Sequence, residues 1–190
     1  MARIQEVFER FNQLNVLIVG DVMVDEYYVG EVTRISPEAP VPVVSVSKRE
    51  RRLGGAANVA LNVKALGANP IMCAVRGNDS EGEWLFSRLN DLGLDNSGVL
   101  IDLDRPTTIK TRVIGNGKQL LRVDQEDCTE IGSQIEKKAI DFIKSCIDRV
   151  DAVIFQDYNK GFLSKKLISH AIKLCNAAGI PSLVDPKIDH

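Results

Sequence analysis

Aromatic side chains are scarce in this sequence, at 5% of 190 residues, and the formal net charge is only -2. Few aromatic rings and no excess of positive charge argue against a nucleic-acid partner. No apolar run approaches the roughly 18 residues of a membrane span. The first 14 residues have the spacing of an amphipathic helix and lack the apolar stretch of a secretory signal. We therefore expect a cytoplasmic protein without a membrane anchor.

Metal-binding patterns are also absent from the sequence. The chain has two histidines, and none of its four cysteines forms a Cys-x-x-Cys pair. This spacing argues against a structural zinc site and against a disulfide framework. We expect all four cysteines to be buried, reduced thiols. The cysteines are Cys73, Cys128, Cys146 and Cys175.

Apolar strands alternate with helical patterns in the second half of the chain, which indicates an α/β fold with a mainly parallel sheet. Two regions, residues 27–46 and 107–124, do not fit that alternation because they are rich in β-branched and aromatic residues. The first contains a proline-rich turn at 36–40, and the second contains Asn116-Gly117, typical of a tight hairpin. We expect these regions to form a small β-sheet beside the body, such as a lid.

Helix boundaries follow from capping residues. The glycine pair at 54–55 is predicted to open a helix. Ser80 and Ser133 each precede a glutamate by three residues, the spacing of a capping box. Ser164 is expected to cap a later helix, which Gly179 should end.

The glycine pair is followed by Asn58 in residues 54–60, which read Gly-Gly-Ala-Ala-Asn-Val-Ala. Glycines let a backbone approach a ligand closely, and the N–H groups of the following helix point toward the same place. The Asn58 amide can donate and accept hydrogen bonds with a hydroxyl-rich ligand. A tight turn with no ligand would explain the glycines equally well.

Asp25 is a second candidate, because it lies just beyond a short apolar strand at 16–19 that Gly20 closes. Open α/β sheets bind ligands at the carboxyl ends of their strands. An ionised carboxylate can accept hydrogen bonds from two adjacent hydroxyls. A solvated or capping aspartate is the alternative. A dinucleotide site is not indicated, because no Gly-x-Gly-x-x-Gly follows the strand.

Residues 54–60, followed by Gly67 and Gly77, resemble the first signature of the ribokinase-like carbohydrate kinases, the phosphofructokinase B family. The resemblance implies a ribokinase-like three-layer α/β/α fold with a β-sheet lid. It also implies ATP and Mg²⁺ as cofactors. In that family the residues matching Gly54, Gly55, Asn58 and Asp25 bind the hydroxyls of the sugar.

Two further stretches, 20–27 and 36–43, look like the kinase domain of the heptose-7-phosphate kinases. They read Gly-Asp-Val-Met-Val-Asp-Glu-Tyr and Ser-Pro-Glu-Ala-Pro-Val-Pro-Val. Residues 110–113, 119–124, 157–161 and 185–187 agree with the same group. The resemblance implies phosphorylation of D-glycero-β-D-manno-heptose 7-phosphate at its anomeric hydroxyl, a step toward ADP-heptose and lipopolysaccharide. Another sugar or nucleoside kinase of the family remains an alternative, as does an inactive sugar-binding or dimerisation module.

Three cations in the second lid region, Lys110, Arg112 and Arg122, are candidates to bind a substrate phosphate. If they share one face of the hairpin, their mutual repulsion favours an anion between them. The solvated face of an edge hairpin is the alternative. By resemblance, Asp157 is a substrate-binding residue near the reacting centre, directed toward the sugar or a metal-bound water, and Lys187 could neutralise nucleotide phosphates. A surface lysine is the alternative for Lys187.

No catalytic base is assigned within the chain. The resemblance implies that the base is the aspartate of a Gly-Ala-Gly-Asp motif, which these residues do not contain and which we expect beyond His190. Residues 1–190 are therefore expected to be the amino-terminal part of one sugar-kinase domain and to be inactive alone. Related kinases pair their lids, so we also expect a homodimer through the lid.

Overall fold

The body of the molecule is a five-stranded parallel sheet of order β5-β4-β1-β8-β9, which a computed structural model describes together with the rest of residues 2–187. The central strand β1 (Asn15–Gly20) pairs with β4 (Asn69–Gly77) and β8 (Ala152–Gln156). The outer strands are β5 (Asp95–Asp102) and β9 (Ser182–Asp185). Because β1 is covered on both faces, its sequence is a continuous apolar run.

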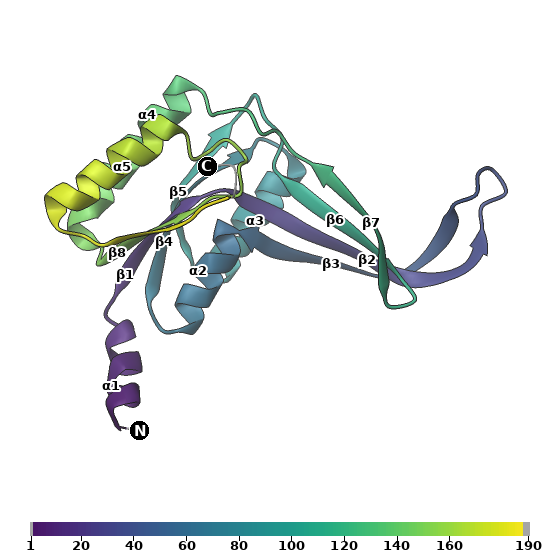
Figure 1. Ribbon diagram of the computed structural model, residues 1–190, viewed down its shortest axis with the longest axis horizontal. Helices are drawn as coiled ribbons and strands as arrows, with labels where there is room; N and C mark the ends of the chain where they lie inside the picture. The colour runs from purple at the N-terminus through teal and green to yellow at the C-terminus, as the bar shows by residue number, and fades with distance from the viewer. Residues whose placement is uncertain (1, 188–190) are drawn as a thin grey trace.

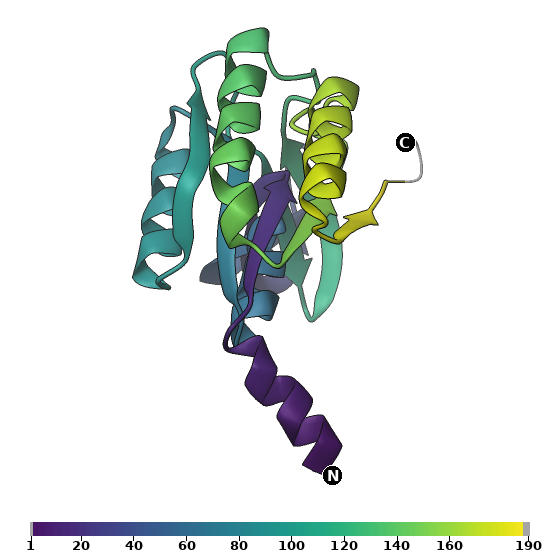
Figure 2. The ribbon, with the colours of Figure 1, turned by 90° about the vertical axis from the view of Figure 1, so that its left-hand side faces the viewer.

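Helices cover both faces of this sheet. Leu17 and Val19 point into one apolar cluster with α4 (Ser133–Cys146) and α5 (Lys165–Ala178), which lie side by side in Figure 2. Val16 and Ile18 point into a second cluster with α2 (Ala56–Ala65) and α3 (Ser80–Asp91). The alternation of side chains along β1 therefore produces the three-layer α/β/α arrangement that was predicted. The amphipathic helix α1 (Ala2–Phe11) projects away from the body (Figure 1).

The lid is a second sheet of order β3-β2-β6-β7. Its strands are β2 (Val22–Ile35), β3 (Pro42–Gly55), β6 (Ile109–Gly115) and β7 (Lys118–Gln125). The predicted lid was too short at its root, because β2 starts directly after β1 and β3 continues to Gly55. Val24, Leu53 and Ile109 are buried in the second apolar cluster, which joins the lid root to the body.

Beyond Gly30, the β2–β3 ladder continues without β6 and β7, and the side chain of Asn116 still binds it, at the backbone N–H and C=O of Val32. Gly30 pairs with Gly115, the last residue of β6, while the β2–β3 ladder continues to the pair Ile35–Pro42. Register shifts interrupt the ladder at Val29/Gly30 and again at Val32/Arg34. The result is a two-stranded arm that extends past the rest of the molecule (Figure 1).

Two predicted capping boxes were wrong. Asp79, not Ser80, caps α3: its carboxylate accepts a hydrogen bond from the Gly82 N–H at 2.7 Å. Gly132, not Ser133, precedes α4 and provides no side-chain cap. The Asp79 carboxylate also accepts hydrogen bonds from the backbone N–H and the hydroxyl of Thr107. These distant contacts favour Asp79 over Ser80 as the cap of α3.

Other local predictions are confirmed. The hydroxyl of Ser164 accepts a hydrogen bond from the Leu167 N–H at 3.1 Å, and Gly179 ends α5 in the left-handed conformation. Asn116 and Gly117 both have positive φ, at 51° and 76°, as a tight β6–β7 turn requires. The sequence had not predicted strand β5, whose apolar run is only three residues long and whose pairing is with β4 alone.

The cysteines are all free thiols, but only three are buried. Cys73, Cys146 and Cys175 lie in the apolar cluster beneath α4 and α5, and burial raises the pKa of the Cys73 thiol. Cys128 is exposed, so the prediction of burial was wrong for this residue.

Candidate functional site

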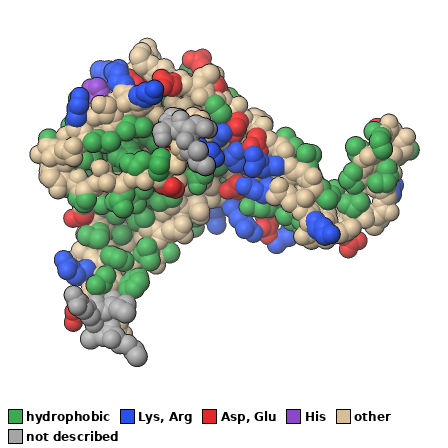
Figure 3. All heavy atoms as spheres, in the orientation of Figure 1, with side chains coloured by type: hydrophobic (Ala, Val, Ile, Leu, Met, Phe, Trp, Pro, Cys, Tyr) green, Lys and Arg blue, Asp and Glu red, His purple; other side chains and the backbone are tan. Residues whose placement is uncertain are grey.

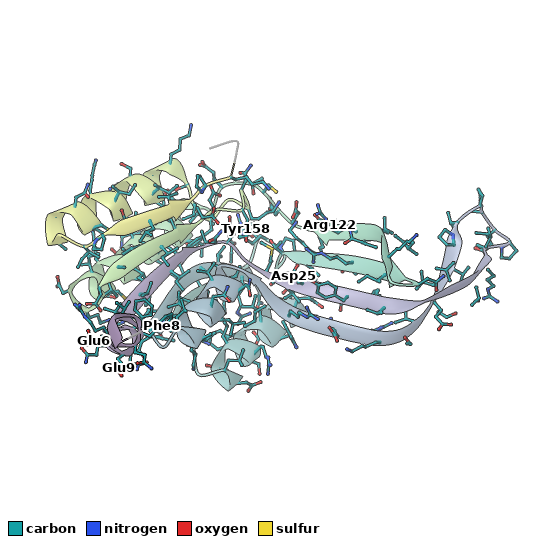
Figure 4. The ribbon with its side chains drawn as sticks, turned by 60° about the horizontal axis from the view of Figure 1, so that its bottom comes forward. Glu6, Phe8, Glu9, Asp25, Arg122 and Tyr158 are labelled. Atoms are coloured by element: carbon teal, nitrogen blue, oxygen red, sulfur yellow. The ribbon has the colours of Figure 1, made fainter. Side chains whose placement is uncertain are left out.

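The candidate site is a cavity of about 360 Å³ between the inner face of the lid and the carboxyl ends of the body strands. Residues from the lid strands, from the start of α2 and from the loops after β7, β8 and β9 line it. Asp25, Arg122 and Tyr158 lie around this junction in Figure 4, and charged side chains gather there in Figure 3. The lining residues are Met23, Asp25, Gly55, Asn58, Lys110, Arg112, Arg122, Asp124, Glu126, Tyr158, Lys160 and Lys187.

Cross-strand register brings the lid residues onto one face. Asp25 of β2 pairs with Lys110 of β6, which in turn pairs with Asp124 of β7. Paired residues on neighbouring strands point to the same side of a sheet. The next row on that face, two residues along, contains the pair Arg112–Arg122. The predicted proximity of the three lid cations is therefore confirmed.

The glycine pair opens α2 as predicted, because Gly55 is both the last residue of β3 and the N-cap of the helix that begins at Ala56. A Cβ on Gly54 would lie 2.4 Å from the Asp25 carboxylate, and a Cβ on Gly55 would lie 2.3 Å from the Asp21 carbonyl oxygen. Gly55 also has a positive φ of 59°. Close packing against β2 and the β1–β2 connection therefore requires both glycines. It also places Asn58, on the first turn of α2, at the cavity wall.

Asp25 already has a cationic partner in the lid. Its carboxylate accepts a hydrogen bond from Arg112 at 2.5 Å, and this bond raises the pKa of the Arg112 guanidinium. The Arg112 side chain also lies over the ring of Tyr27, 5.3 Å from its centroid. The carboxylate is thus held at the cavity by a charge-assisted bond that limits its rotation.

The expectation that the three lid cations need a bound anion to relieve their repulsion is wrong. The Lys110 amine binds Asp124 at 2.9 Å and Glu126 at 3.1 Å, and Arg122 binds Asp124 at 2.9 Å. Hydrogen bonding to Lys110 and then Arg122 lowers the pKa of Asp124. The protein itself supplies carboxylates beside each cation.

An excess of positive charge nevertheless remains at the cavity. Five of its lining residues are cations and three are carboxylates, so their formal charge is +2. Two of the cations, Lys160 and Lys187, come from the body. Lys160 binds Glu126 at 2.7 Å, which links the body to the lid. Burial alone would raise the pKa of Glu126, but hydrogen bonds from Lys160 and Lys110 outweigh it and lower that pKa.

Asp157 does not line the cavity. Its side chain is buried, and its carboxylate accepts the Asn159 N–H at 2.7 Å. The neighbouring Tyr158 and Lys160 face the cavity instead. These two residues, like Asp124 and Glu126, were not among the predicted site residues, although all four lie in or beside the motifs that indicated the site. Lys187 is exposed and lies at the edge of the cavity.

Asp25 and Asn58 also line a neighbouring cavity of about 400 Å³. Its cations are Arg51, Arg52 and Arg88. Among residues 2–187, no group of three or more histidine, cysteine or acidic side chains is arranged to hold a metal ion. None of the helices in that range is long and apolar enough to cross a membrane.

Comparison with known proteins gives consistent matches. The profile described as pfkB family carbohydrate kinase matches residues 13–190. A protein named bifunctional protein HldE from Desulfatibacillum aliphaticivorans is 46% identical over 177 residues, covering 93% of this chain and 36% of that protein. The same-named protein of Helicobacter pylori strain J99 is 45% identical over 172 residues, covering 90% of this chain and 37% of the relative. The chain thus spans about a third of the length of these curated relatives.

Solved structures share the fold. A carbohydrate kinase from Agrobacterium tumefaciens superposes with a TM-score of 0.66 at 19% identity, covering 90% of this chain and 53% of that one. An Arabidopsis thaliana ribokinase complexed with ribose and ATP superposes with a TM-score of 0.62 at 16% identity, with the same two coverages. The ribokinase-like fold expected from the sequence is confirmed.

Proposed function

The chain belongs to the pfkB family of carbohydrate kinases, and we propose that its protein transfers a phosphoryl group from ATP to a sugar phosphate. The proposed substrate is D-glycero-β-D-manno-heptose 7-phosphate, phosphorylated at the anomeric hydroxyl on the route to ADP-heptose and lipopolysaccharide. The curated relatives named bifunctional protein HldE support this choice within the family. We propose that the reaction takes place in the cytoplasm.

The observation that carries the proposal is the composition of the lid–body cavity. One wall offers the Asp25 carboxylate and the Asn58 amide, which suit sugar hydroxyls. The other walls bring the formal charge to +2, which suits an anionic substrate. A kinase for a neutral sugar needs the first feature only.

Each substrate-binding residue predicted in the lid or at the start of α2 then has a proposed role. Asp25 and Asn58 bind hydroxyls, while Gly54 and Gly55 let the backbone approach the sugar. Lys110, Arg112 and Arg122 bind the substrate's own phosphate from the lid. That phosphate would share these cations with Asp124, Glu126 and Asp25 and would not replace missing partners.

We propose that Lys187 contacts the phosphates of ATP and that Asp157, buried behind the cavity, shapes the loop next to them. Mg²⁺ usually binds through one or two carboxylates plus the substrate phosphates, so the absence of a three-ligand cluster among residues 2–187 is compatible with Mg²⁺ arriving on ATP. When bound, the ion neutralises charge that develops on the transferred group.

The catalytic base is proposed to be the aspartate of a Gly-Ala-Gly-Asp motif, which residues 1–190 do not contain. A polypeptide of these residues alone should therefore show no ATP-dependent turnover. Coupled measurement of ADP release tests this. Turnover by the pure polypeptide would mean that a residue within 1–190 acts as the base.

We also propose that the protein forms a homodimer through the lid. Leu121 and Val123 of β7 are about half exposed. An apolar, solvent-exposed sheet face of this kind is typical of an interaction surface. A second copy of the lid offers the same surface, as a two-fold interface requires.

Replacement of Asp25 by asparagine tests the proposed sugar site. In the whole protein, Asp25→Asn should weaken heptose 7-phosphate binding by roughly 1–3 kcal/mol, because Arg112 and the sugar hydroxyls lose a charged acceptor. ATP affinity should hardly change. Calorimetry with each ligand separates the two effects. Unaltered sugar affinity would show that Asp25 only anchors Arg112, and preference of the wild-type enzyme for an unphosphorylated sugar would refute the proposed substrate.

A further inference from the structure

Asp21, the residue between β1 and β2, is a buried carboxylate that the proposed function leaves without a role. It is 3% exposed and makes three hydrogen bonds to one loop of the body. One carboxylate oxygen accepts the N–H of Tyr158 at 2.9 Å and that of Lys160 at 3.1 Å. The other oxygen accepts the N–H of Phe162 at 3.2 Å. Each donor is at least 137 residues away along the chain.

The loop at 157–162 is shaped around this carboxylate. Tyr158, Lys160 and Phe162 alternate with Asn159 and Gly161, which have positive φ of 54° and 81°. The alternation turns every second N–H group toward one point. Such a concave set of backbone N–H groups normally binds an external anion. Here the side chain of Asp21 occupies it from within.

The backbone of Asp21 makes two more connections. Its N–H donates to the Gln156 carbonyl at 3.2 Å, and its carbonyl accepts the N–H of Ala56, the first residue of α2, at 2.8 Å. One residue therefore joins the end of β8, the start of α2 and the 157–162 loop. Asn58 lies on the first turn of the helix so joined, and Tyr158 and Lys160 extend from the loop into the cavity.

The connection continues from the loop into the lid. The Lys160 amine binds Glu126 at 2.7 Å, and Glu126 also accepts from Lys110 at 3.1 Å. Lys110 in turn binds Asp124, the partner of Arg122. Lys160 is thus bound by Asp21 at its backbone N–H and by Glu126 of the lid at its amine.

We propose that Asp21 is a positioning residue that fixes Tyr158 and Lys160 against the lid cations, and so sets the geometry of the sugar-phosphate site without touching the ligand. The identity of the ligand rests on the proposed function, whereas the positioning role does not. Burial raises the pKa of the Asp21 carboxyl, and the three N–H groups oppose that shift. The loop's hydrogen bonds thus hold a charge that burial disfavours.

Amide hydrogen exchange in the whole protein tests the positioning directly. Asp21→Asn replaces one acceptor oxygen by a donor, so the N–H groups of Tyr158, Lys160 and Phe162 should exchange at least roughly tenfold faster. Amides of β1 and α5 should keep their rates. Unchanged exchange at the three positions, or equal acceleration throughout the protein, would refute the proposal. Asp21→Ser, which still accepts one hydrogen bond, gives the same readout if the asparagine variant does not fold.

A binding cycle tests the path through Lys160. Asp21→Asn and Lys160→Met should each weaken heptose 7-phosphate binding about tenfold, and the double variant should be no weaker than about the worse single variant. Fully additive losses would show that Asp21 acts elsewhere, which would overturn the proposed path. If the wild-type protein does not bind heptose 7-phosphate, the proposed substrate is wrong, while the exchange experiment still decides the role of Asp21.

Discussion

The body and the lid differ in how far their side chains are buried and in which interactions hold them together. In the body, Leu17, Met72 and Phe155 are fully buried between two helical layers. In the lid, side chains on β7 such as Leu121 and Val123 remain about half exposed. Ion pairs between neighbouring strands, including Lys110–Asp124, take the place of an apolar core there.

This difference indicates how each part is stabilised. Burial of apolar surface supplies most of the free energy of folding, so the body should determine global stability. Partly solvated ion pairs contribute little, so the lid should be held mainly by its backbone ladders, its buried root and whatever binds to it. A ligand or a second copy would then affect the lid more than the body.

The same substitution in both regions tests this contrast most strongly. Leu17→Ala should lower the free energy of unfolding by about 3–5 kcal/mol, because it leaves a cavity in the body. Leu121→Ala should change it by less than about 0.5 kcal/mol. Denaturant titration of dilute protein measures both. Equal losses would mean that the lid and the body share one core.

Enzyme activity, in contrast to stability, should depend strongly on the cationic residues of the lid. Arg112→Ala or Arg122→Ala in the whole enzyme should raise KM for heptose 7-phosphate by about tenfold or more, roughly 1.4 kcal/mol, because a charge-assisted phosphate contact is lost. Arg49→Ala is the matched control, since Arg49 lies on the other face of the lid over Tyr28. Activity on unphosphorylated sugars should hardly change in Arg122→Ala, whereas Arg112→Ala should lower it as well, because it also removes the partner that orients Asp25. A larger effect of Arg88→Ala would place the phosphate in the neighbouring cavity.

Association should depend on the lid alone. Leu121→Glu places a charge in the proposed two-fold interface and should weaken dimerisation about tenfold or more. Leu103→Glu, on an exposed residue of the body, should not. Sedimentation across micromolar concentrations compares the two variants. A wild-type protein that is monomeric throughout this range would contradict the lid dimer.

The smallest expected effect concerns pH. Lys110 and Arg122 hold the pKa of Asp124 below its ordinary value of 3.8. A lowered pKa in the folded state stabilises the fold above the ordinary pKa, and that contribution is lost as pH falls through the lowered one. It should amount to less than about 1 kcal/mol, because the pair is partly solvated. Asp124→Asn should abolish only this part of the acid dependence of unfolding.

Local signals predicted much of the fold. Gly179 and the Asn116-Gly117 turn were correctly placed because their conformations depend on neighbours in sequence. The choice of Asp79 as the cap of α3 was not predictable, because Asp79 is held by hydrogen bonds from Thr107, which is 28 residues away along the chain. The carboxylates beside the lid cations were missed for a similar reason. Their positions depend on a β6–β7 register that shifts between Val113 and Ile114.

Site residues were likewise predicted where their motif is local in the sequence and missed where their contacts are distant. Asp25 and Asn58 were found because their motif lies within a short stretch of sequence, and both line the cavity. Asp21 is as close in sequence to that motif, yet its partners come from β8 and the loop after it. Hydrogen bonds across more than a hundred residues leave no periodic pattern for sequence analysis to detect.

The two-stranded arm beyond Gly30 acts mechanically as a lever. It has about five residues on each strand, so it is roughly 16 Å long at about 3.3 Å per residue. A rotation of about 10° at its base, where the ladder register shifts, would move its tip by roughly 3 Å. Such a rotation would therefore be detected most readily at the proline-rich turn. A spectroscopic label at that turn would report it.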